Sequence, residues 1–257
     1  MHDIQNEPDG RSIFIDEVGI SGLRYPLTFD DGHTRQHGIA DIAVTVALQA
    51  ERRGTHMSRM IALVHEEAAT LSPQELPTVL KRGLTLLDAP GLTLTFTLPI
   101  ATLVAAPASG QESWQTHDLT LTGRIDDSNC TVTTSVTTHV TSLCPCSKAI
   151  SDYGAHNQRS EVTLQVTGTT DAPYPLPFHD MVALLRGAGS APVIPLIKRP
   201  DERVVTMQAY DHPVFVEDIV RDISLVCRQR GLSHAVQARN LESIHSHDAI
   251  ATLSYTG

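Results

Sequence analysis

The sequence predicts an α+β fold built from two tandem β-β-α-α-β-β units, each an antiparallel sheet with helices on one face. Two observations support this prediction. Segments with alternating apolar residues indicate strands, whereas longer stretches with capping residues, proline or glycine at their ends indicate helices. Both halves of the 257-residue chain follow the same order of two strands, two helices and two strands, although we find no residue-level repeat.

The first unit is expected over residues 12–129, after a flexible N-terminus at residues 1–11. Thr55 is a candidate N-cap for the first helix, and Pro73 stands near the first position of the second helix. The expected elements are strands at 12–24 and 38–51, helices at 57–70 and 72–87, and strands at 91–104 and 116–127.

The second unit is expected over residues 130–257. Val132, Val136 and Val140 share one face of a segment rich in Thr and Val, which is typical of a strand. Asp211 is a candidate cap for a long helix that ends before Gly231. The expected elements are strands at 131–142 and 161–168, helices at 178–187 and 213–230, and strands at 233–243 and 248–255.

The composition limits the classes of partner. A formal net charge of −10 and a pI near 5.6 argue against nucleic acid or an anionic membrane as the partner. The polar first residues do not resemble a signal peptide, and no apolar run approaches ~20 residues. Four cysteines are too few for a secreted disulfide scaffold, so the sequence predicts a cytoplasmic protein.

The most informative segment is residues 141–160, which brings Cys144, Cys146 and His156 together with small polar and basic residues. Gly154 permits a turn just before the histidine. A thiolate and an imidazole are ligands that a zinc-like ion prefers, so the segment suggests a metal or catalytic site. The alternatives are a pair of inert, buried thiols or a redox pair.

Motifs spread along most of the chain, in the expected order, resemble those of GTP cyclohydrolase IB, a prokaryotic enzyme family. One motif is the Cys-Pro-Cys segment itself, and another holds the histidine that follows it. The segments that carry the resemblance are Gly54–Arg59, Ser142–Lys148, Gly154–Arg159, Lys198–Glu202, Phe215–Asp218 and Asn240–His247.

This resemblance implies the tunnelling fold, with two modules in each subunit and four subunits assembled as a homotetramer around a central tunnel. It also implies a reaction. The family hydrolyses GTP at C8, opens the imidazole ring, releases formate and forms 7,8-dihydroneopterin triphosphate, the first step of folate and tetrahydropterin biosynthesis. Attack at C8 needs an activated water, which a divalent metal with an open coordination position provides.

The resemblance points to Cys144, His156 and Glu202 as the three protein ligands of that metal. Zinc, manganese and ferrous iron all suit such a ligand set. Asp201 offers the same ligand oxygens as its neighbour Glu202. In an extended segment the two side chains would point to opposite faces, so one of them is expected to bind. Without the resemblance, both would be solvated acids in a polar loop.

Other residues of the motifs are expected to act on the substrate. Cys146 would lie beside the metal and assist proton transfer, pair with Cys144 on oxidation, or be an inert thiol. His247 is the predicted acid/base group, because the departing nitrogen needs a proton, and His245 would share its strand face as the rival candidate. Glu217 is expected to accept two parallel hydrogen bonds from guanine; otherwise it is an ordinary carboxylate in the first turn of a helix.

The triphosphate of GTP requires cations, and several stand inside or beside the motifs. No Walker-type phosphate loop is present in the sequence, which fits an enzyme that leaves the triphosphate intact. Two other functions stay open: a relative that forms a cyclic dihydroneopterin phosphate, and a non-enzymatic metal-binding module of the same fold. The candidate cations are Arg53, Arg59, Lys148, Arg159, Lys198 and Arg199, and the hydroxyls of Ser58, Ser147 and Ser151 are further candidates.

Overall fold

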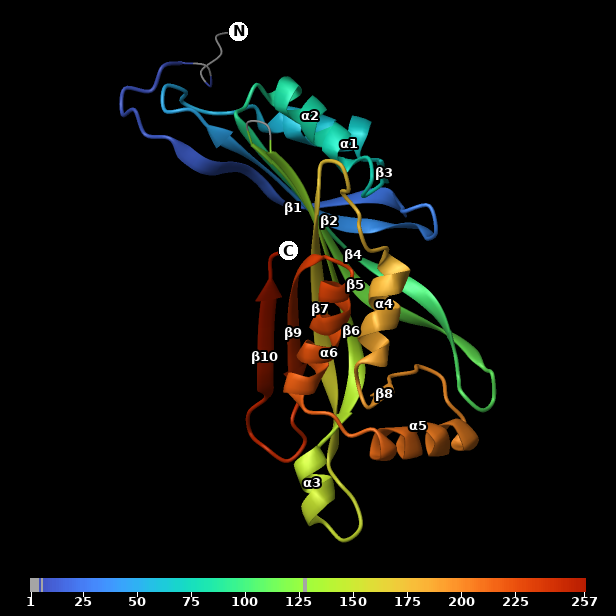
Figure 1. The fold of residues 1–257 in the computed structure, drawn as a ribbon. Helices are drawn as coiled ribbons and strands as arrows, with labels where there is room; N and C mark the ends of the chain where they lie inside the picture. Colours follow the sequence, from blue (N-terminus) through green and yellow to red (C-terminus); the bar gives the residue numbers. More distant parts are fainter. Residues whose placement is uncertain (1–4, 6, 127–128) are drawn as a thin grey trace. The chain divides into compact units, whose positions relative to one another are not determined.

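The computed structural model describes residues 5, 7–126 and 129–257 and has an α+β architecture (Figure 1). No helix in these ranges is long and apolar enough to cross a membrane. In chain order the elements are β1 (Ile15–Asp30), β2 (Arg35–Leu48), α1 (Met57–Glu67), β3 (Thr70–Leu71), α2 (Leu76–Leu87), β4 (Gly91–Ala105), β5 (Glu112–Asp126), β6 (Asn129–Leu143), α3 (Pro145–Ile150), β7 (Asn157–Thr169), α4 (Phe178–Gly187), β8 (Ala191–Pro192), α5 (Arg199–Asp211), α6 (Val216–Gln229), β9 (Ser233–Asn240) and β10 (Ala249–Tyr255).

The chain forms two compact units, which we describe separately. Strands β4, β5, β6 and β7 each contribute residues to both units, so neither unit is one continuous half of the sequence. The predicted division into sequential modules at residues 129 and 130 stays a prediction. Unit 1 comprises Met1–Leu98, Thr120–Thr134 and Thr167–Pro175, and unit 2 comprises Pro99–Leu119, Ser135–Val166 and Leu176–Gly257.

Part of the predicted flexible N-terminus, residues 1–4 and 6, lies outside the described residues. The remainder has backbone partners in the segment before α1. The Asp9 N–H donates to the carbonyl of Glu51 at 2.9 Å, and the Gly54 N–H donates to the carbonyl of Gln5 at 3.1 Å. This pairing could not be predicted, because backbone hydrogen bonds leave no pattern of side chains.

In unit 1 the strand order is β3-β1-β2-β4-β5-β6-β7. Helix α2 approaches the sheet and α1 closely, and two glycines make the approach possible. A Cβ on Gly83 would lie 2.4 Å from the side chain of Leu92 and 2.9 Å from that of Leu63. A Cβ on Gly123 of β5 would lie 2.9 Å from Leu76 at the start of α2. Larger residues at these positions would force α2 away from its neighbours.

In unit 2 the strand order is β10-β9-β7-β6-β5-β4, with the short β8 paired to β6. Helices α4 and α6 lie on one face of this sheet, and α3 lies beyond the ends of β6 and β7 (Figure 1). Val136, Val140 and Leu164 are fully buried under the helices, together with Ile219 and Ile223 of α6. The alternation of apolar and Thr residues on β6 thus forms a core strand, as the sequence predicted.

Helices α5 and α6 differ from the sequence-based expectation. Helix α5 was not predicted, because only Asp201 and Ala209 of its 13 residues are buried, so the sequence has no apolar stripe there. Helix α6 begins at Val216, later than expected. Asp211 ends α5 instead of capping α6, and Asp218 accepts a hydrogen bond from the Phe215 N–H at 3.0 Å.

Candidate active site

The thiols, imidazoles and guanine-binding carboxylate predicted from the sequence line a single cavity of ≈ 330 Å³ in unit 2. A cavity of ≈ 340 Å³ in unit 1 is lined by carboxylates, one arginine and apolar residues, with no Cys or His in its lining. Of these two cavities, the one in unit 2 is therefore the one lined by the predicted thiols and imidazoles. Its lining is Cys144, Cys146, His156, Phe215, Val216, Glu217, Asn240, Glu242, His245, His247 and Ala249.

Backbone hydrogen bonds bring Cys144 and His156 together. Cys144 follows β6 and is the N-cap of the six-residue helix α3, where its Sγ accepts a hydrogen bond from the Ser147 N–H at 3.4 Å. The Cys144 N–H donates to the His156 carbonyl at 3.1 Å. The His156 N–H in turn donates to Ser147 Oγ at 3.3 Å. These hydrogen bonds join the two ends of the connection from β6 to β7, and both candidate ligands lie where the ends meet.

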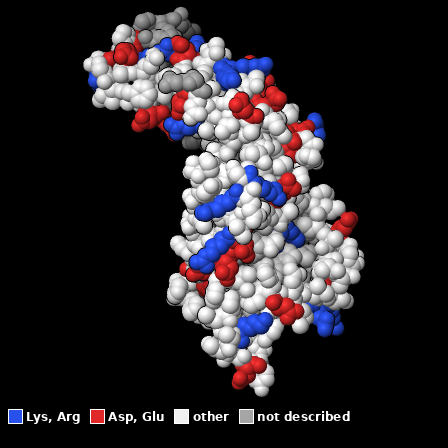
Figure 2. Space-filling view, in the orientation of Figure 1, with Lys and Arg blue, Asp and Glu red and all other residues white. Residues whose placement is uncertain are grey.

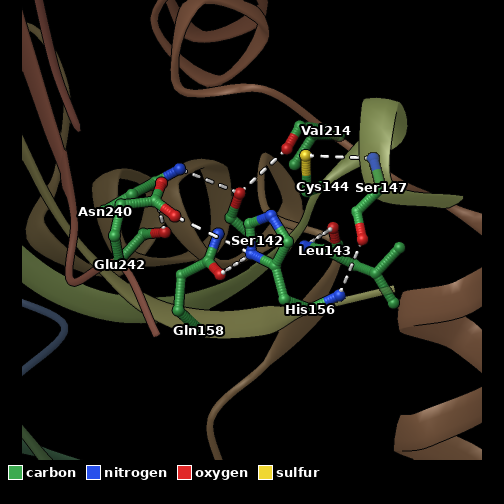
Figure 3. Close-up of polar contacts among 11 residues, drawn as sticks. Ser142, Leu143, Cys144, Ser147, His156, Gln158, Val214, Asn240 and Glu242 are labelled. Atoms are coloured by element: carbon green, nitrogen blue, oxygen red, sulfur yellow. Dashed lines mark hydrogen bonds and ion pairs between the residues drawn. The ribbon is translucent and has the colours of Figure 1, made fainter. Parts of the chain in front are cut away.

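Two oxygen-bearing side chains approach the same nitrogen of the His156 ring (Figure 3). Its Nδ1 is 2.8 Å from Gln158 Oε1 and 3.7 Å from Glu242 Oε2. The Glu242 side chain is only 10% exposed, and its Oε2 is buried without a hydrogen-bond partner. Sequence analysis missed both residues as individuals, although both lie within the motifs. A glutamate and a glutamine in polar segments give no signal of burial until the fold is known.

A buried chain of hydrogen bonds holds the walls of the cavity in register (Figure 3). Ser160 Oγ of β7 donates to Asn240 Oδ1 at 2.6 Å, and Asn240 Nδ2 of β9 donates to Ser142 Oγ at 3.0 Å. Ser142 Oγ of β6 donates to the Val214 carbonyl at 2.8 Å. The chain therefore connects three strands to the segment that leads into α6, where Glu217 lies.

His245 and His247 lie in the connection between β9 and β10, not in a strand as the sequence analysis assumed. Their rings still come together, stacked with centroids 5.2 Å apart. The His245 ring also meets His156 edge-on, with centroids 6.4 Å apart. The structure thus brings both rival acid/base candidates to the cavity, and their roles stay a prediction.

Glu217 lies in the first turn of α6 and lines the cavity with an exposed side chain. Exposure in a first turn is also what an ordinary helix-capping carboxylate shows. What distinguishes Glu217 is that it lines the same cavity as the thiols and imidazoles. Its role in holding guanine stays a prediction.

Asp201 and Glu202 do point in different directions, but from the first turn of helix α5, not from an extended segment. Asp201 is fully buried and accepts hydrogen bonds from Ala108, Ser109 and Lys198. Burial raises the pKa of this carboxyl, but the hydrogen bonds outweigh that effect and hold its pKa well below the ordinary value. Asp201 is thus committed to a structural role, whereas Glu202 is exposed and does not line the cavity of its own chain.

The candidate cations do not line the cavity. The Lys148 ammonium contacts the Tyr210 carbonyl and lies 4.2 Å from the centroid of the Tyr210 ring, which ties α3 to the end of α5. Arg53 pairs with Glu7, and Arg59 lies on α1 of unit 1. Arg159, Lys198 and Arg199 are exposed on unit 2. On the face drawn in Figure 2, Lys and Arg lie scattered among Asp and Glu over the described residues.

The donor types at the cavity suit a divalent metal. Cys144 and His156 offer sulfur and nitrogen, and a carboxylate oxygen of Glu242 is buried with no hydrogen-bond donor. Such an oxygen is costly to bury, and a cation nearby would compensate it. Across the described ranges, however, no group of three His, Cys, Asp or Glu side chains is arranged to hold a metal ion. The site of a single chain is therefore compatible with a metal but offers no complete ligand set.

Comparison with solved structures confirms the predicted tunnelling fold. The uricase from Arthrobacter globiformis matches with a TM-score of 0.51 at 12% identity, covering 94% of this chain and 94% of its own. The uricase from Bacillus fastidious matches with a TM-score of 0.50 at 10% identity, covering 96% of this chain and 94% of its own. At such low identity these matches concern the fold alone.

Comparison with protein families and curated sequences is more specific. A family model described as type I GTP cyclohydrolase FolE2 matches residues 1–251. The GTP cyclohydrolase FolE2 of Neisseria meningitidis serogroup C is 40% identical over 255 residues, covering 98% of this chain and 84% of the relative. Those of Herminiimonas arsenicoxydans and Cupriavidus necator are also 40% identical, covering 98% of this chain and 95% and 94% of the relatives. The chain belongs to the type I GTP cyclohydrolase FolE2 family, as the motifs predicted.

Proposed function

We propose that the unit 2 cavity is the active site at which this protein converts GTP and water to 7,8-dihydroneopterin triphosphate and formate. The observation that carries the proposal is that one cavity gathers Cys144, Cys146, His156, Glu217, His245 and His247 in a member of this family. The enzymes of the family act on GTP and are metal-dependent. The two alternatives, a cyclic phosphate product and a non-enzymatic metal-binding module, are not favoured, because the relatives are named GTP cyclohydrolases.

In this proposal Cys144 and His156 hold a divalent metal, and Glu202 completes the set. Bound there, the metal would supply an activated water for attack at C8 of guanine. Because Glu202 does not line the cavity of its own chain, we propose that it comes from another copy of the protein. Zinc, manganese and ferrous iron all suit thiolate, imidazole and carboxylate ligands.

Residues of the chain itself position the substrate and move protons. The Glu217 carboxylate accepts the guanine ring N–H and exocyclic amine together, a donor pair that adenine lacks. His247 donates the proton that the departing ring nitrogen needs, and its stacked neighbour His245 is the alternative donor. Cys146, exposed at the cavity, assists proton transfer. Arg59, Lys148, Arg159 and Lys198 are the proposed partners of the triphosphate.

The experiment that tests this function is an incubation of metal-loaded protein with GTP. Formate and a pterin that keeps three phosphates should appear together, and a chelator should abolish both. A cyclic phosphate product would replace the main proposal with the alternative enzyme. Tight metal binding without any GTP turnover would overturn the enzymatic proposal.

We further propose a homotetramer with active sites shared between subunits. In unit 2 the sheet ends at β10, whose outer edge pairs with no other strand among the described residues, and Ile250 on β10 is 67% exposed. Such an edge favours association with another chain. A cytoplasmic location is part of the proposal, supported by four cysteines in the thiol form that a reducing compartment maintains.

Mixing two inactive variants tests the shared site. His156→Ala and Glu202→Ala should each be inactive, but co-folded chains should regain activity at about a quarter of their sites by random assembly. Light scattering should show four subunits. A fully active monomer, or mixed chains that regain nothing, would contradict the sharing of sites.

A further inference from the structure

We propose that Gln158 is a positioning residue that fixes the protonation of the His156 ring, with the hydrogen on Nδ1 and the lone pair on Nε2. Nε2 is then the nitrogen free to bind a metal. This inference deepens the proposed function and rests on it only in taking His156 as a metal ligand.

The first argument is the short contact between the two side chains. His156 Nδ1 and Gln158 Oε1 are 2.8 Å apart, which is a normal hydrogen-bond distance. An amide oxygen carries no hydrogen, so the ring nitrogen must be the donor. Gln158 is only 6% exposed and belongs to strand β7, so its side chain is held by the surrounding packing.

Glu242 favours the same tautomer more weakly, because its Oε2 is too far from His156 Nδ1 for a hydrogen bond. Its Oε2 lies 3.7 Å from His156 Nδ1, and the side chain comes from the connection after β9, far from Gln158 in the sequence. A carboxylate accepts but does not donate. A lone pair on Nδ1 would face two oxygens and be repelled by both, whereas an N–H there is attracted to both. The other tautomer is thus disfavoured from two sides of the same atom.

The consequence concerns the metal. A neutral imidazole binds a metal through the nitrogen that carries no hydrogen, and the partner of its other nitrogen sets which one that is. Without Gln158 the ring would populate both tautomers and rotate more freely. Metal binding would then have to order the ring, which would make the binding free energy less favourable. Loss of such an orienting partner typically weakens metal binding by ~10–100-fold.

The test combines a spectroscopic measurement with a binding measurement. The ¹⁵N NMR spectrum of metal-free protein with labelled histidine, at a pH where imidazole is neutral, should show His156 protonated at Nδ1. Gln158→Leu should shift the ring toward a tautomer mixture and raise the zinc dissociation constant, measured by chelator competition, ~10–100-fold. Gln158→Glu keeps an acceptor oxygen and should retain the wild-type tautomer. Gln165→Leu, at an exposed position on the same strand, is the matched control.

Several results would overturn the inference. One is wild-type His156 protonated at Nε2, and this result needs no variant to fold. Another is Gln158→Leu with an unchanged tautomer and unchanged zinc affinity. If the wild-type protein turns over no GTP while the tautomer and zinc results hold, the proposed function fails and the inference stands. If turnover occurs with the opposite tautomer, the inference alone fails.

Discussion

Two hairpin connections of unit 2 are each associated with a carboxylate: the β4–β5 connection contacts Asp201 of α5, and the β9–β10 connection contains Glu242. The two carboxylates differ in their hydrogen-bond partners. At the β4–β5 connection, Asp201 accepts from Ala108 N–H at 2.7 Å, Ser109 N–H at 2.7 Å, Ser109 Oγ at 2.6 Å and Lys198 N–H at 2.8 Å. At the β9–β10 connection, Glu242 has one oxygen buried with no hydrogen bond at all.

The difference separates a carboxylate with four hydrogen bonds from one with an oxygen that accepts none. Buried polar groups in folded proteins nearly always have partners, so a buried oxygen without one requires an explanation. Asp201 uses its charge to clamp a loop onto the start of α5. Glu242 lines the cavity of the thiols and imidazoles, and its Oε2 lies 3.7 Å from His156 Nδ1. Substitution of cavity residues should therefore affect activity, whereas substitution of Asp201 should affect stability.

The largest loss of activity is expected from a substitution in the β9–β10 connection, which contains His247. His247→Ala should lower formate release by ~10²–10⁴-fold, because the departing nitrogen loses its proton donor, while GTP and metal binding stay near normal. Single-turnover formate assays with separate binding measurements check this. His245→Ala is the control from the same stacked pair. A dead His245→Ala beside an active His247→Ala would move the acid role to His245, and two active variants would make Cys146 the next candidate.

Glu217→Gln should weaken use of GTP with the fold intact. The glutamine amide presents a donor to the donors of guanine, and a mismatched buried polar group costs on the order of 1–3 kcal/mol. The expected loss in kcat/KM is therefore ~10–100-fold. Asp222→Asn, at an exposed position on the same helix, is the matched control and should change little. Unchanged kinetics for Glu217→Gln would return this residue to the ordinary role of a first-turn carboxylate.

Asp201→Asn should lower thermal stability and leave metal binding unchanged. The amide NH₂ would face backbone and hydroxyl donors that now point at a carboxylate, so Tm should fall by several degrees. At low temperature, zinc affinity per folded chain should stay close to wild type. Calorimetry and chelator competition measure the two properties. A variant with unchanged Tm would contradict the stabilising role that we assign to Asp201.

The smallest effect concerns His117, a buried side chain that, like Asp201, has hydrogen-bond partners. Its ring nitrogens lie 2.8 Å from Thr102 Oγ1 and 2.7 Å from Thr138 Oγ1. Burial, with smaller effects of Arg186 and His139, lowers the pKa of His117 from 6.5 to about 4. The unfolded chain therefore binds this proton at higher pH than the folded chain does.

The stability that neutral His117 contributes should be complete above pH 6.5 and be lost as pH falls from 6.5 toward 4. Thermal unfolding of wild type and His117→Gln across this range measures the contribution. The gap in Tm should narrow by a few degrees toward low pH. A gap that is constant from pH 7 to pH 4 would show that His117 does not titrate with folding.

Elements with a clear apolar pattern were predictable, and those held by polar contacts were not. Helix α4 begins and ends at the predicted residues 178 and 187, and β6 has its valines on the buried face. Helix α5 has no apolar stripe, so its place depends on Asp201 and on contacts that only the fold provides. His245 and His247 were expected to share a strand face, but they lie in the loop between β9 and β10.

Only some residues of the candidate site could likewise be predicted from the sequence. Cys144 and His156 could be singled out because thiols and imidazoles are rare and chemically distinctive. Gln158 and Glu242 are common residue types, and their importance comes from a 2.8 Å contact and a buried oxygen without a partner. No spacing in the sequence encodes either feature. The placement of Glu202 outside the cavity likewise depends on the fold and, in our proposal, on the assembly.

The most direct test of the account is anomalous X-ray diffraction from crystals of the zinc-loaded protein. The account predicts a zinc peak in the unit 2 cavity, about 2.3 Å from Cys144 Sγ and about 2.0–2.1 Å from His156 Nε2. The Glu242 carboxylate should face that site, and Asp201 should keep its hydrogen bonds to Ala108 and Ser109. Zinc bound away from Cys144 and His156, or through His156 Nδ1, would contradict the account.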